Sequence, residues 1–354
     1  MVQKIRIKDI AEKSGVSVGT VDRILHNRPN VSKKAREKVE QVMKEINYRP
    51  NRYASALAYN KQYTFFIIMP QHEREAYWQE VEEGAKRACE AMTDFHVDLQ
   101  IKYFTRFDAA SYAETFQQVI DSQPNGVVVV PSELELTKPY TDMLHERDIP
   151  FVLLDSYYPE LKPLSFFGQD PISSGSFAAR ILMLIAYGET EIMLMKQTKD
   201  GKAASNQQAL REEGFRQYMA DHFPAIRIVD FELPQTFEQS EIDSHLDRFF
   251  AEHPDVHHCI TMSSRAHFVG TYLLRNNRRD IQIMGYDMVN QNARCLREGS
   301  ISFLIAQHAF VQGHGCVDTL FKAIVLKQEV ASVNYMPIEL LTPENVDFYR
   351  RTLI

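Results

Sequence analysis

From residue 7 to residue 58 the chain reads IKDIAEKSGVSVGTVDRILHNRPNVSKKAREKVEQVMKEINYRPNRYASALA. The beginning of this stretch predicts a short helix at residues 7–13, and Gly15 behind it can adopt the positive φ of a tight turn. Ser17 is then suited to cap a second helix at 18–26, because its hydroxyl can accept a hydrogen bond from an unsatisfied backbone N–H. The apolar residues expected to meet between the two helices are Ile10, Ala11, Val16, Val21, Ile24 and Leu25. Two short helices packed across such a turn are typical of a helix-turn-helix.

The rest of the stretch predicts a third helix and a short fourth one. Ser32 can cap the third helix, whose apolar residues recur at the spacing of one helical face. Those residues are Ala35, Val39, Val42, Met43 and Ile46. Pro50 ends the pattern, and Asn51 can cap a short alanine-rich segment. We therefore expect an all-α head at residues 1–50 and a hinge helix with its linker at 51–62.

The charge of the chain is unevenly distributed. Residues 1–61 hold 14 Lys or Arg against 6 Asp or Glu, a balance of +8, and the whole chain has a formal net charge of −7, so the remainder carries −15. A basic segment with periodic apolar residues is typical of a nucleic-acid-binding head, since phosphate contacts supply most of the sequence-independent affinity. A solvated basic arm is the alternative, which the helical periodicity disfavours.

From Thr64 onward, short β-rich runs alternate with helical stretches. The expected strands are at residues 65–69, 97–104, 126–130, 151–154, 192–195, 226–231, 258–262 and 281–286. The expected helices are at residues 78–92, 111–122, 174–187, 207–221 and 266–276. Continuous apolar runs such as the one at 126–130 are typical of parallel strands buried on both faces. Because residues 63–354 are too many for one such sheet, we expect an α/β body of two doubly wound parallel-sheet subdomains behind the helical head.

Residues 7–58 resemble the head of the LacI-type (lactose-repressor, galactose-repressor) family of bacterial regulators. The resemblance rests on the KDIA of the first helix, the SGVS turn, the TV-x-R of the second helix, the VS-x-x-x-R of the third and the Y-x-PN-x-x-A-x-x-L that follows. The remainder looks like the ligand domain of that family, which is similar to type I periplasmic binding proteins. The resemblance implies one subdomain at about 63–165 and 293–325, and another at about 166–292 and 326–354.

The resemblance also implies a function. A member of this family is expected to be a sequence-specific DNA-binding regulator, a repressor of carbohydrate-metabolism genes, and a homodimer on a pseudo-palindromic operator in double-stranded DNA. A small sugar or sugar-derived effector, bound between the two subdomains, would control it allosterically. The same architecture answering to a purine or another non-sugar metabolite stays open, and a solute-binding protein is a weaker alternative because of the head. We expect no enzymatic activity and no cofactor.

Within the head, the resemblance points to residues that contact DNA. Val18 and Gly19 stand where the family usually reads bases; neither can make a bidentate hydrogen bond, although Val18 can touch a thymine methyl group. Asp22 stands where serine is usual, and Arg23 keeps a fork suited to guanine. Leu57 matches a residue that the family inserts between base pairs, the alternative being a residue that packs within the linker. The expected DNA-contacting residues are Lys8, Ser17, Val18, Gly19, Thr20, Arg23, Asn27, Ser32, Tyr48, Asn51, Arg52, Ala54 and Leu57.

Polar and aromatic residues near the ends of the expected strands form the expected effector site, because ligands of such folds bind outside the carboxyl ends of the strands. These residues are Tyr77, Trp78, Asp155, Gln169, Asp170, Asn206, Arg211, Ser264, Arg265, Asp287 and Gln307. Carboxylates and guanidinium groups can chelate adjacent hydroxyls of a sugar, and an aromatic face can stack on its ring. Two alternatives stand beside this prediction: Trp78 as a core residue and Asp170 as a helix N-cap.

Ser264 and Arg265 depart from the Asn-Asp pair that the family usually carries at this point. An arginine there would favour an acidic or a phosphorylated sugar. It would equally allow an ion pair with Asp287 and leave a neutral ligand. The resemblance therefore does not identify the effector.

Other classes of protein find no support in the sequence. The four cysteines are scattered, which predicts neither a zinc site nor a disulfide framework; they are Cys89, Cys259, Cys295 and Cys316. No apolar leader follows Met1 and no run reaches the ~18 apolar residues of a membrane span, so we expect a cytoplasmic protein without a membrane partner. No Walker loop, nucleophile elbow or H-E-x-x-H motif is present, and we expect no metal site.

Overall fold

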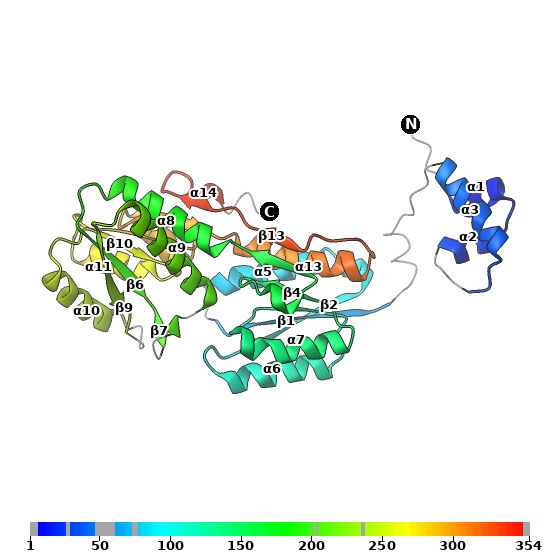
Figure 1. The fold of residues 1–354 in the computed structure, drawn as a ribbon, viewed down its shortest axis with the longest axis horizontal. Coiled ribbons are helices and arrows are strands. Elements are labelled where there is room, and N and C mark those ends of the chain that lie inside the picture. The colour runs from blue at the N-terminus through cyan, green and yellow to red at the C-terminus, as the bar shows by residue number, and fades with distance from the viewer. Residues whose placement is uncertain are drawn as a thin grey trace. The chain divides into compact units, whose positions relative to one another are not determined.

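The computed structural model describes residues 6–25, 29–46, 61–72, 77–199, 202–203, 205–234 and 238–349. It divides the chain into two compact units, Met1–Asn60 and Lys61–Ile354, which we call the head and the body (Figure 1). Six residues expected to contact DNA lie outside the described residues: Asn27, Tyr48, Asn51, Arg52, Ala54 and Leu57. The expected hinge helix lies outside them as well.

The described helices of the head are α1 (Ile7–Ser14), α2 (Val18–Leu25) and α3 (Lys33–Glu45). Gly15, between α1 and α2, adopts a φ of 67°, as the sequence predicts for this turn. The hydroxyl of Ser17 accepts a hydrogen bond of 3.1 Å from the backbone N–H of Thr20 and so caps α2. Ser32 caps α3 in the same way, through a 3.2 Å hydrogen bond from the backbone N–H of Ala35.

The core of the head consists of the residues that helical periodicity predicts. Its buried members are Ile10, Ala11, Val21, Ile24 and Val39. Partly buried residues packed against them are Ile7, Val16, Leu25, Val31, Val42, Met43 and Ile46. Apolar residues of all three helices meet in this cluster, so the prediction of a helix-turn-helix with a third supporting helix is confirmed.

The first sheet of the body has six described strands, all parallel, in the order β13-β5-β4-β3-β1-β2. The strands are β1 (Tyr63–Pro70), β2 (Val97–Phe104), β3 (Gly126–Val129), β4 (Phe151–Leu154), β5 (Ser165–Gly168) and β13 (Val333–Tyr335). Helices α6 (Ala109–Asp121) and α7 (Leu134–Glu146) cover one face, and α5 (Tyr77–Glu90) and α13 (Ala309–Ile324) cover the other (Figure 1). We call this part the first half.

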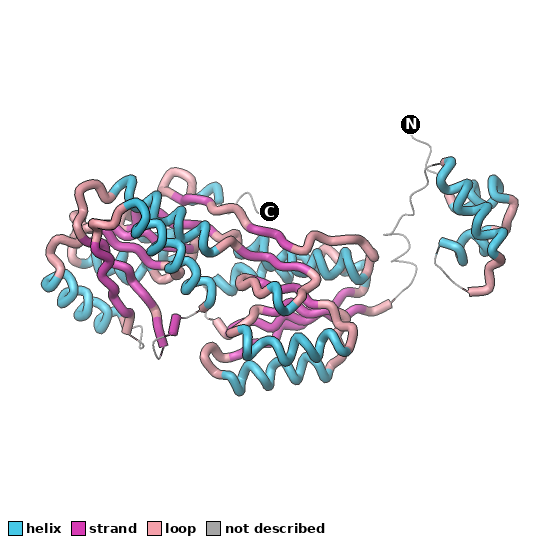
Figure 2. The backbone as a smooth tube through the Cα atoms, in the orientation of Figure 1, coloured by secondary structure: helices cyan, strands magenta, loops and turns pink. Residues whose placement is uncertain are grey.

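The second sheet has the order β14-β12-β11-β10-β6-β9 in the described part of the body, and β14 is its antiparallel strand. Its strands are β6 (Glu191–Lys196), β9 (Arg227–Glu232), β10 (His258–Thr261), β11 (Gln282–Tyr286), β12 (Ile301–Ala306) and β14 (Glu339–Leu341). Helices α8 (Pro171–Ile185) and α9 (Asn206–His222) cover one face; α10 (Gln239–Glu252), α11 (Ala266–Arg275) and α12 (Asn290–Arg297) cover the other (Figure 2). We call this part the second half.

Shorter elements complete the described body. They are the 3₁₀ helices η1 (Thr93–Phe95) and η2 (Pro159–Leu161), the hairpin strands β7 (Thr198–Lys199) and β8 (Lys202–Ala203), and helix α14 (Val346–Tyr349). The strands and helices that the sequence predicts for the body are all present, with ends that differ by at most three residues. The prediction of two doubly wound sheets is therefore confirmed.

The chain crosses between the halves at places that differ from the expected ones. Strand β5 pairs within the first sheet, so the first crossing follows Gly168 rather than residue 165. Helix α12 and strand β12 belong to the second half, so the second crossing follows Ala306 rather than residue 292. The third crossing lies between β13 and β14, about ten residues later than expected. The expectation failed because a short apolar run can pair in either sheet, and only its tertiary neighbours decide which.

Each half contains a helix pair that crosses at two glycines. In the first half, a Cβ on Gly313 of α13 would lie 1.9 Å from the carbonyl oxygen of Val81 on α5. In the second half, a Cβ on Gly175 of α8 would lie 2.0 Å from the carbonyl oxygen of Arg211 on α9. Glycine is required at these points because the two backbones are in direct contact. These pairs hold the helices that reach the carboxyl ends of both sheets.

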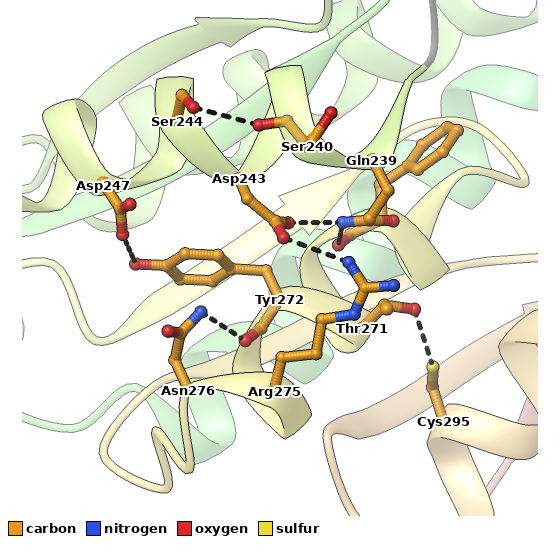
Figure 3. A network of polar contacts seen from close by, with 11 residues as sticks. Gln239, Ser240, Asp243, Ser244, Asp247, Thr271, Tyr272, Arg275, Asn276 and Cys295 are labelled. Carbon is orange, nitrogen blue, oxygen red and sulfur yellow. Dashed lines mark hydrogen bonds and ion pairs between the residues drawn. The ribbon is translucent and has the colours of Figure 1, made fainter.

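Helices α10 and α11 are joined by polar contacts on the other face of the second sheet (Figure 3). The amide of Gln239 donates to Asp243 at 2.6 Å, and Arg275 donates to the second oxygen of the same carboxylate at 3.2 Å. The hydroxyl of Tyr272 donates to Asp247 at 2.8 Å. These contacts hold α10 and α11 in place on a face that is not part of the site described below. We therefore assign them a structural role.

Candidate functional site

Two aspartates mark equivalent places at the carboxyl ends of the two sheets. Asp155 directly follows β4, and Asp287 directly follows β11. Each of these strands is third in its sheet, counted from the edge formed by β13 or β14. Both residues are buried, and both adopt a left-handed backbone, with φ of 72° and 68°. Aspartate tolerates this conformation better than most side chains, and such positions gather at functional sites.

Asp287 belongs to a chain of contacts that starts at Arg211. A guanidinium nitrogen of Arg211 donates to Oε1 of Gln307, and Nε2 of Gln307 donates to Oδ1 of Asp287 at 2.6 Å. A second nitrogen of Arg211 donates to the carbonyl of Met262 at 3.2 Å, and the guanidinium carbon lies 4.4 Å from the ring centroid of Tyr286. The structure thus brings together three of the predicted site residues.

Burial dominates the electrostatics of Asp287. It raises the pKa of this carboxyl group to about 7, although the charge of Arg211 and the hydrogen bond from Gln307 act in the opposite direction. The carboxyl group of Asp287 therefore changes its charge near neutral pH. A ligand that donates hydrogen bonds to the ionised form would favour that form.

Asp155 lies at the contact between the halves. The hydroxyl of Tyr77 donates to its Oδ1 at 3.5 Å, and the side-chain amide of Gln207, at the start of α9, donates to its backbone carbonyl. Burial raises the pKa of the Asp155 carboxyl group, while the charges of Arg211 and Arg106 oppose this rise. Asp155 and Arg211 come from different halves, so their charges act on each other between the two sheets.

Three buried polar atoms around this cluster make no hydrogen bond within the described part of the chain. They are Oε1 of Gln207, Nε of Arg211 and Oε1 of Gln312. Buried polar groups are nearly always paired, and each unpaired one has a desolvation cost of about 1–3 kcal/mol. The cluster therefore offers two acceptors and one donor to a polar ligand.

The aromatic pair at the start of α5 is buried. The rings of Tyr77 and Trp78 meet edge to face at 4.9 Å between centroids. Burial raises the pKa of the Tyr77 hydroxyl well above its usual value, and the charges of Asp155 and Asp287 add to this. Tyr77 thus lies beside both aspartates. The guanidinium carbon of Arg106 lies 5.5 Å from the ring centroid of Trp78, so this ring supports a cation, whichever role Trp78 has toward a ligand.

Two of the predicted residues have their side chains engaged in holding the backbone. Asp170 is the N-cap of α8 and accepts a hydrogen bond of 2.7 Å from the backbone N–H of Ser173. Gln169 donates to the carbonyls of Ala306 and Pro337, at 3.1 and 2.9 Å. It therefore connects all three crossings, and an effector contact for either residue stays a prediction.

The three remaining predicted residues lie next to elements that carry the cluster. Asn206 begins α9, next to Gln207. Ser264 accepts a hydrogen bond of 3.1 Å at its carbonyl from Asn292. Arg265 is the N-cap residue of α11. The ion pair between Arg265 and Asp287 stays a possibility that the sequence left open, and the guanidinium carbon of Arg265 lies 5.7 Å from the ring centroid of Phe268.

Three residues that the sequence did not single out belong to the same place. Gln207 and Gln312 carry two of the unpaired acceptors, and Arg106 acts electrostatically on Asp155. The sequence could have pointed to Arg106, because this residue lies just beyond the carboxyl end of β2. The predicted site residues were selected for the same kind of position after other strands. The two glutamines are within helices, where nothing in the sequence distinguishes them from solvated residues.

The head presents the expected reading positions to its surface. Ser17, Val18, Gly19 and Arg23 are exposed, and Val18 has an exposed fraction of 49%. Arg23 donates to the carbonyl of Pro29 at a distance of 3.5 Å. Lys8 and Ser32 are exposed as well, whereas the partly buried Thr20 shares a hydrogen bond of 2.9 Å with the hydroxyl of Ser17. The described part of the expected DNA-contacting set is thus on accessible surface, and its role toward DNA stays a prediction.

Comparison with known proteins places both parts of the chain. Residues 6–51 match the lacI family of bacterial regulatory proteins, and residues 65–328 match the periplasmic binding protein domain. The chain belongs to the lacI family of bacterial regulatory proteins. A structure assigned as a LacI transcriptional regulator from Bacteroides fragilis is 42% identical, with a TM-score of 0.79 over 82% of this chain and 100% of the other.

Curated relatives of this LacI-family chain include regulators from two bacteria. Catabolite control protein B of Bacillus subtilis is 38% identical over 104 residues, 27% of this chain and 33% of the relative. The HTH-type transcriptional regulator MalR of Streptococcus pneumoniae is 23% identical over 298 residues, 81% of this chain and 84% of the relative. The match thus spans about a third of the first relative and most of the second. Among the helices of the described residues, none is both long and apolar enough to cross a membrane.

Proposed function

We propose that this chain is a sequence-specific DNA-binding regulator of transcription, acting in the cytoplasm as a homodimer on a pseudo-palindromic operator. A polyhydroxylated effector, a sugar or sugar derivative bound between the halves of the body, sets its affinity for DNA. Its targets would be genes of carbohydrate metabolism, with repression as the expected action. The exposed start of α2 and the basic balance of residues 1–61 support the DNA-binding part.

The contacts around Asp287 carry the effector part of this proposal. Sugar hydroxyls both donate and accept, so a sugar site needs acceptors and donors side by side. Asp155 and Asp287 supply acceptors, Arg211 supplies donors, and the unpaired atoms of Gln207 and Gln312 add further acceptors. A purine would need an aromatic face, and the Trp78 ring already carries Arg106. The donors and acceptors side by side support a sugar, and a purine is the alternative that a binding screen with both classes would test.

A continuous set of contacts connects this cluster with the crossings. Arg211 lies against the ring of Tyr286, whose hydroxyl donates to the carbonyl of Ser174 at 3.1 Å. The hydroxyl of Ser174 donates to Gln169 at 2.7 Å, and Gln169 binds the backbone of the other two crossings. An effector that moves Arg211 would therefore act on the segments about which the halves can turn. This is the coupling that we propose between effector and DNA.

The DNA-binding part is tested by selection of operators from a random double-stranded library with the full chain. We expect enrichment of a two-fold symmetric sequence, since a dimer presents two heads to two half-sites. Arg23→Ala should weaken binding to the selected sequence by about tenfold or more and binding to unrelated DNA by less than twofold, as for the loss of a base contact. Arg294→Ala, at an exposed position of α12, is the matched control and should change neither affinity. Failure to enrich any sequence would contradict the proposed function.

A further inference from the structure

Asn292, the third residue of α12, is fully buried and contacts two loops at the carboxyl end of the second sheet. Its side-chain amide donates to the carbonyls of Ser264, Tyr286 and Asp287, at 3.1, 2.9 and 3.0 Å. Its side-chain oxygen accepts from the backbone N–H of His267 at 2.8 Å and lies 3.1 Å from Nδ1 of the same residue. One side chain therefore joins the loop after β10, the loop after β11 and the start of α11.

The backbone of Asp287 is held on both sides of its left-handed conformation. Its N–H donates to the carbonyl of Ile305 on β12 at 2.9 Å, and its carbonyl accepts from Asn292. The N–H of Tyr286 donates to the carbonyl of Ser263 at 3.4 Å, and the carbonyl of Tyr286 also accepts from Asn292. A left-handed backbone is unfavourable for a residue other than glycine, so it persists where the surrounding contacts impose it. The Asn292 amide thus helps to fix the direction in which the Asp287 side chain leaves the sheet.

This direction decides which groups the carboxylate of Asp287 meets. The carboxylate accepts from Nε2 of Gln307 at 2.6 Å, and Oε1 of Gln307 accepts from Arg211. Hydrogen bonds weaken steeply when the donor or the acceptor turns away, so a small backbone movement at Asp287 would lose this alignment. The Asn292 amide donates to backbone carbonyls, and it therefore acts on these side chains through the position of Asp287.

The corresponding carbonyl in the first half is held in a different way. The carbonyl of Asp155 accepts from the side chain of Gln207, which belongs to α9 of the second half. This contact joins the two halves and would be lost if they moved apart. The contacts of Asn292 with the two loops and with α11 lie within the second half. They can hold Asp287 in place before an effector brings the halves together.

We propose that Asn292 is the positioning residue of the effector site. By holding the backbone of Asp287, it keeps the Asp287 carboxylate, Gln307 and Arg211 aligned in the free protein for the hydroxyl groups of an effector. This inference rests on the proposed function and adds to it the residue that preorganises one side of the site. Preorganisation lowers the conformational cost of binding, so its loss weakens affinity although no group that touches the effector is removed.

The titration of Asp287 reports on its position without a ligand. Burial raises the pKa of this carboxyl group to about 7, against the charge of Arg211 and the hydrogen bond from Gln307. The charges of Glu80 and Asp155 add to the rise. Three hydroxyl groups also interact with its charge, those of Tyr77, Tyr286 and Tyr349. A carboxyl group that leaves this position becomes hydrated, and its pKa then falls toward the ordinary value.

The experiment follows Asp287 by carbon-13 NMR on the free full chain, labelled at the carboxyl carbons of aspartate. The signal is assigned by its loss in Asp287→Asn. Asp287 should titrate near pH 7 in the wild type and at about pH 6 or below in Asn292→Ala. Asn292→Ser keeps a hydroxyl that can donate one hydrogen bond, so its shift should be smaller, and it serves as the second variant if Asn292→Ala does not fold. Melting temperatures show which variants are folded.

Asn334→Ala is the matched control. The amide of Asn334 also donates to a backbone carbonyl, that of Phe166 at 3.1 Å, but it does so in the first half. This substitution should lower the melting temperature and leave the titration of Asp287 unchanged. It therefore separates a loss of positioning from a general loss of stability.

Effector binding is then measured on the same variants by titration calorimetry at pH 8. The probes are D-glucose, D-galactose, D-ribose, D-gluconate and D-glucose 6-phosphate. We expect the probe that binds the wild type most tightly to bind Asn292→Ala about tenfold or more weakly, because the site must then be ordered on binding. Its affinity for Asn334→Ala should stay within about twofold of the wild type.

The outcomes separate this inference from the proposed function. The inference is overturned if Asp287 titrates at the same pH in the folded Asn292 variants as in the wild type, or if Asn334→Ala shifts the titration as much. It is also overturned if the preferred probe binds Asn292→Ala as tightly as the wild type, and the proposed function then still stands if that probe changes the affinity for selected DNA. A shifted titration in a chain that binds none of the probes would support the positioning of Asp287 and contradict the effector part of the proposed function.

Discussion

Gln169 and Gln307 occupy the same place in the two halves and act differently. Gln169 follows β5 where the chain first leaves the first sheet, and Gln307 follows β12 where it returns from the second. The side chain of Gln169 donates hydrogen bonds to the carbonyls of Ala306 and Pro337 and accepts one from the hydroxyl of Ser174. Gln307 instead connects Arg211 with Asp287. One glutamine fixes the crossings, and the other takes part in the candidate site.

The comparison extends to the rest of the two halves. Each places an aspartate with a left-handed backbone after its third strand and brings two helices together at a pair of glycines. The backbone plan is thus repeated, whereas the side chains that face the site are not. A repeated fold fixes where a side chain stands, and the residue types around it decide what it does.

The strongest test of the repeated plan is a methyl group at the helix crossings. Gly175→Ala and Gly313→Ala each place a Cβ within 2.0 Å of a backbone oxygen of the facing helix, so the helices must separate. We expect each substitution to lower the free energy of unfolding by about 3 kcal/mol, measured by chemical denaturation. Gly19→Ala is the control, because its Cβ would lie no closer than 3.9 Å to another residue. If only one of the two substitutions lowers the free energy of unfolding this much, the two helix crossings are not equivalent.

The two glutamines provide the next test. Gln169→Ala leaves the buried carbonyl of Ala306 and the less buried carbonyl of Pro337 without their donor, which should lower the free energy of unfolding by about 1–3 kcal/mol. Gln307→Ala removes the group between Arg211 and Asp287, and should weaken binding of the preferred sugar or sugar derivative by about tenfold or more. Denaturation and calorimetry on both variants separate the two effects. Equal losses of stability and affinity for the pair would show that the glutamines share one role.

The smallest expected effect is the pH dependence of effector binding. Asp287 has a pKa of about 7 in the free protein, so a ligand that needs the ionised carboxylate should bind about tenfold more tightly at pH 8 than at pH 6. The stability of the fold changes with pH in the opposite direction to effector binding. The unfolded carboxyl group ionises near pH 4, so stability is full below that pH and decreases as the pH rises toward 7.

Asp287→Asn is the variant that assigns this pH dependence. It should bind the effector weakly and without the change between pH 6 and 8, and it should be more stable than the wild type at pH 8. Asp155→Asn is the matched comparison in the other half, since burial raises the pKa of that carboxyl group too. Calorimetry at three pH values measures both variants. A tenfold change that persists in Asp287→Asn would assign the titration to another group.

The local helices, turns and strands could be predicted from the sequence, and the head illustrates this. Gly15, Ser17 and the apolar face of each helix specify their own turns, caps and contacts within a few dozen residues. In the body, the strands with long apolar runs were predictable for the same reason. Strand β5 and helix α13 were not, because their type depends on the sheet against which they pack.

For the site, residue type and position after a strand were enough to select Asp155, Arg211, Asp287 and Gln307, with the family resemblance as support. The sequence by itself determined these local features, since capping, periodicity and strand ends involve neighbours along the chain. Only the tertiary structure decided that Gln169 serves the crossings and that the charge of Arg265 acts on Arg106. Those contacts join residues more than a hundred positions apart, and their energies depend on burial that exists only once both halves are packed.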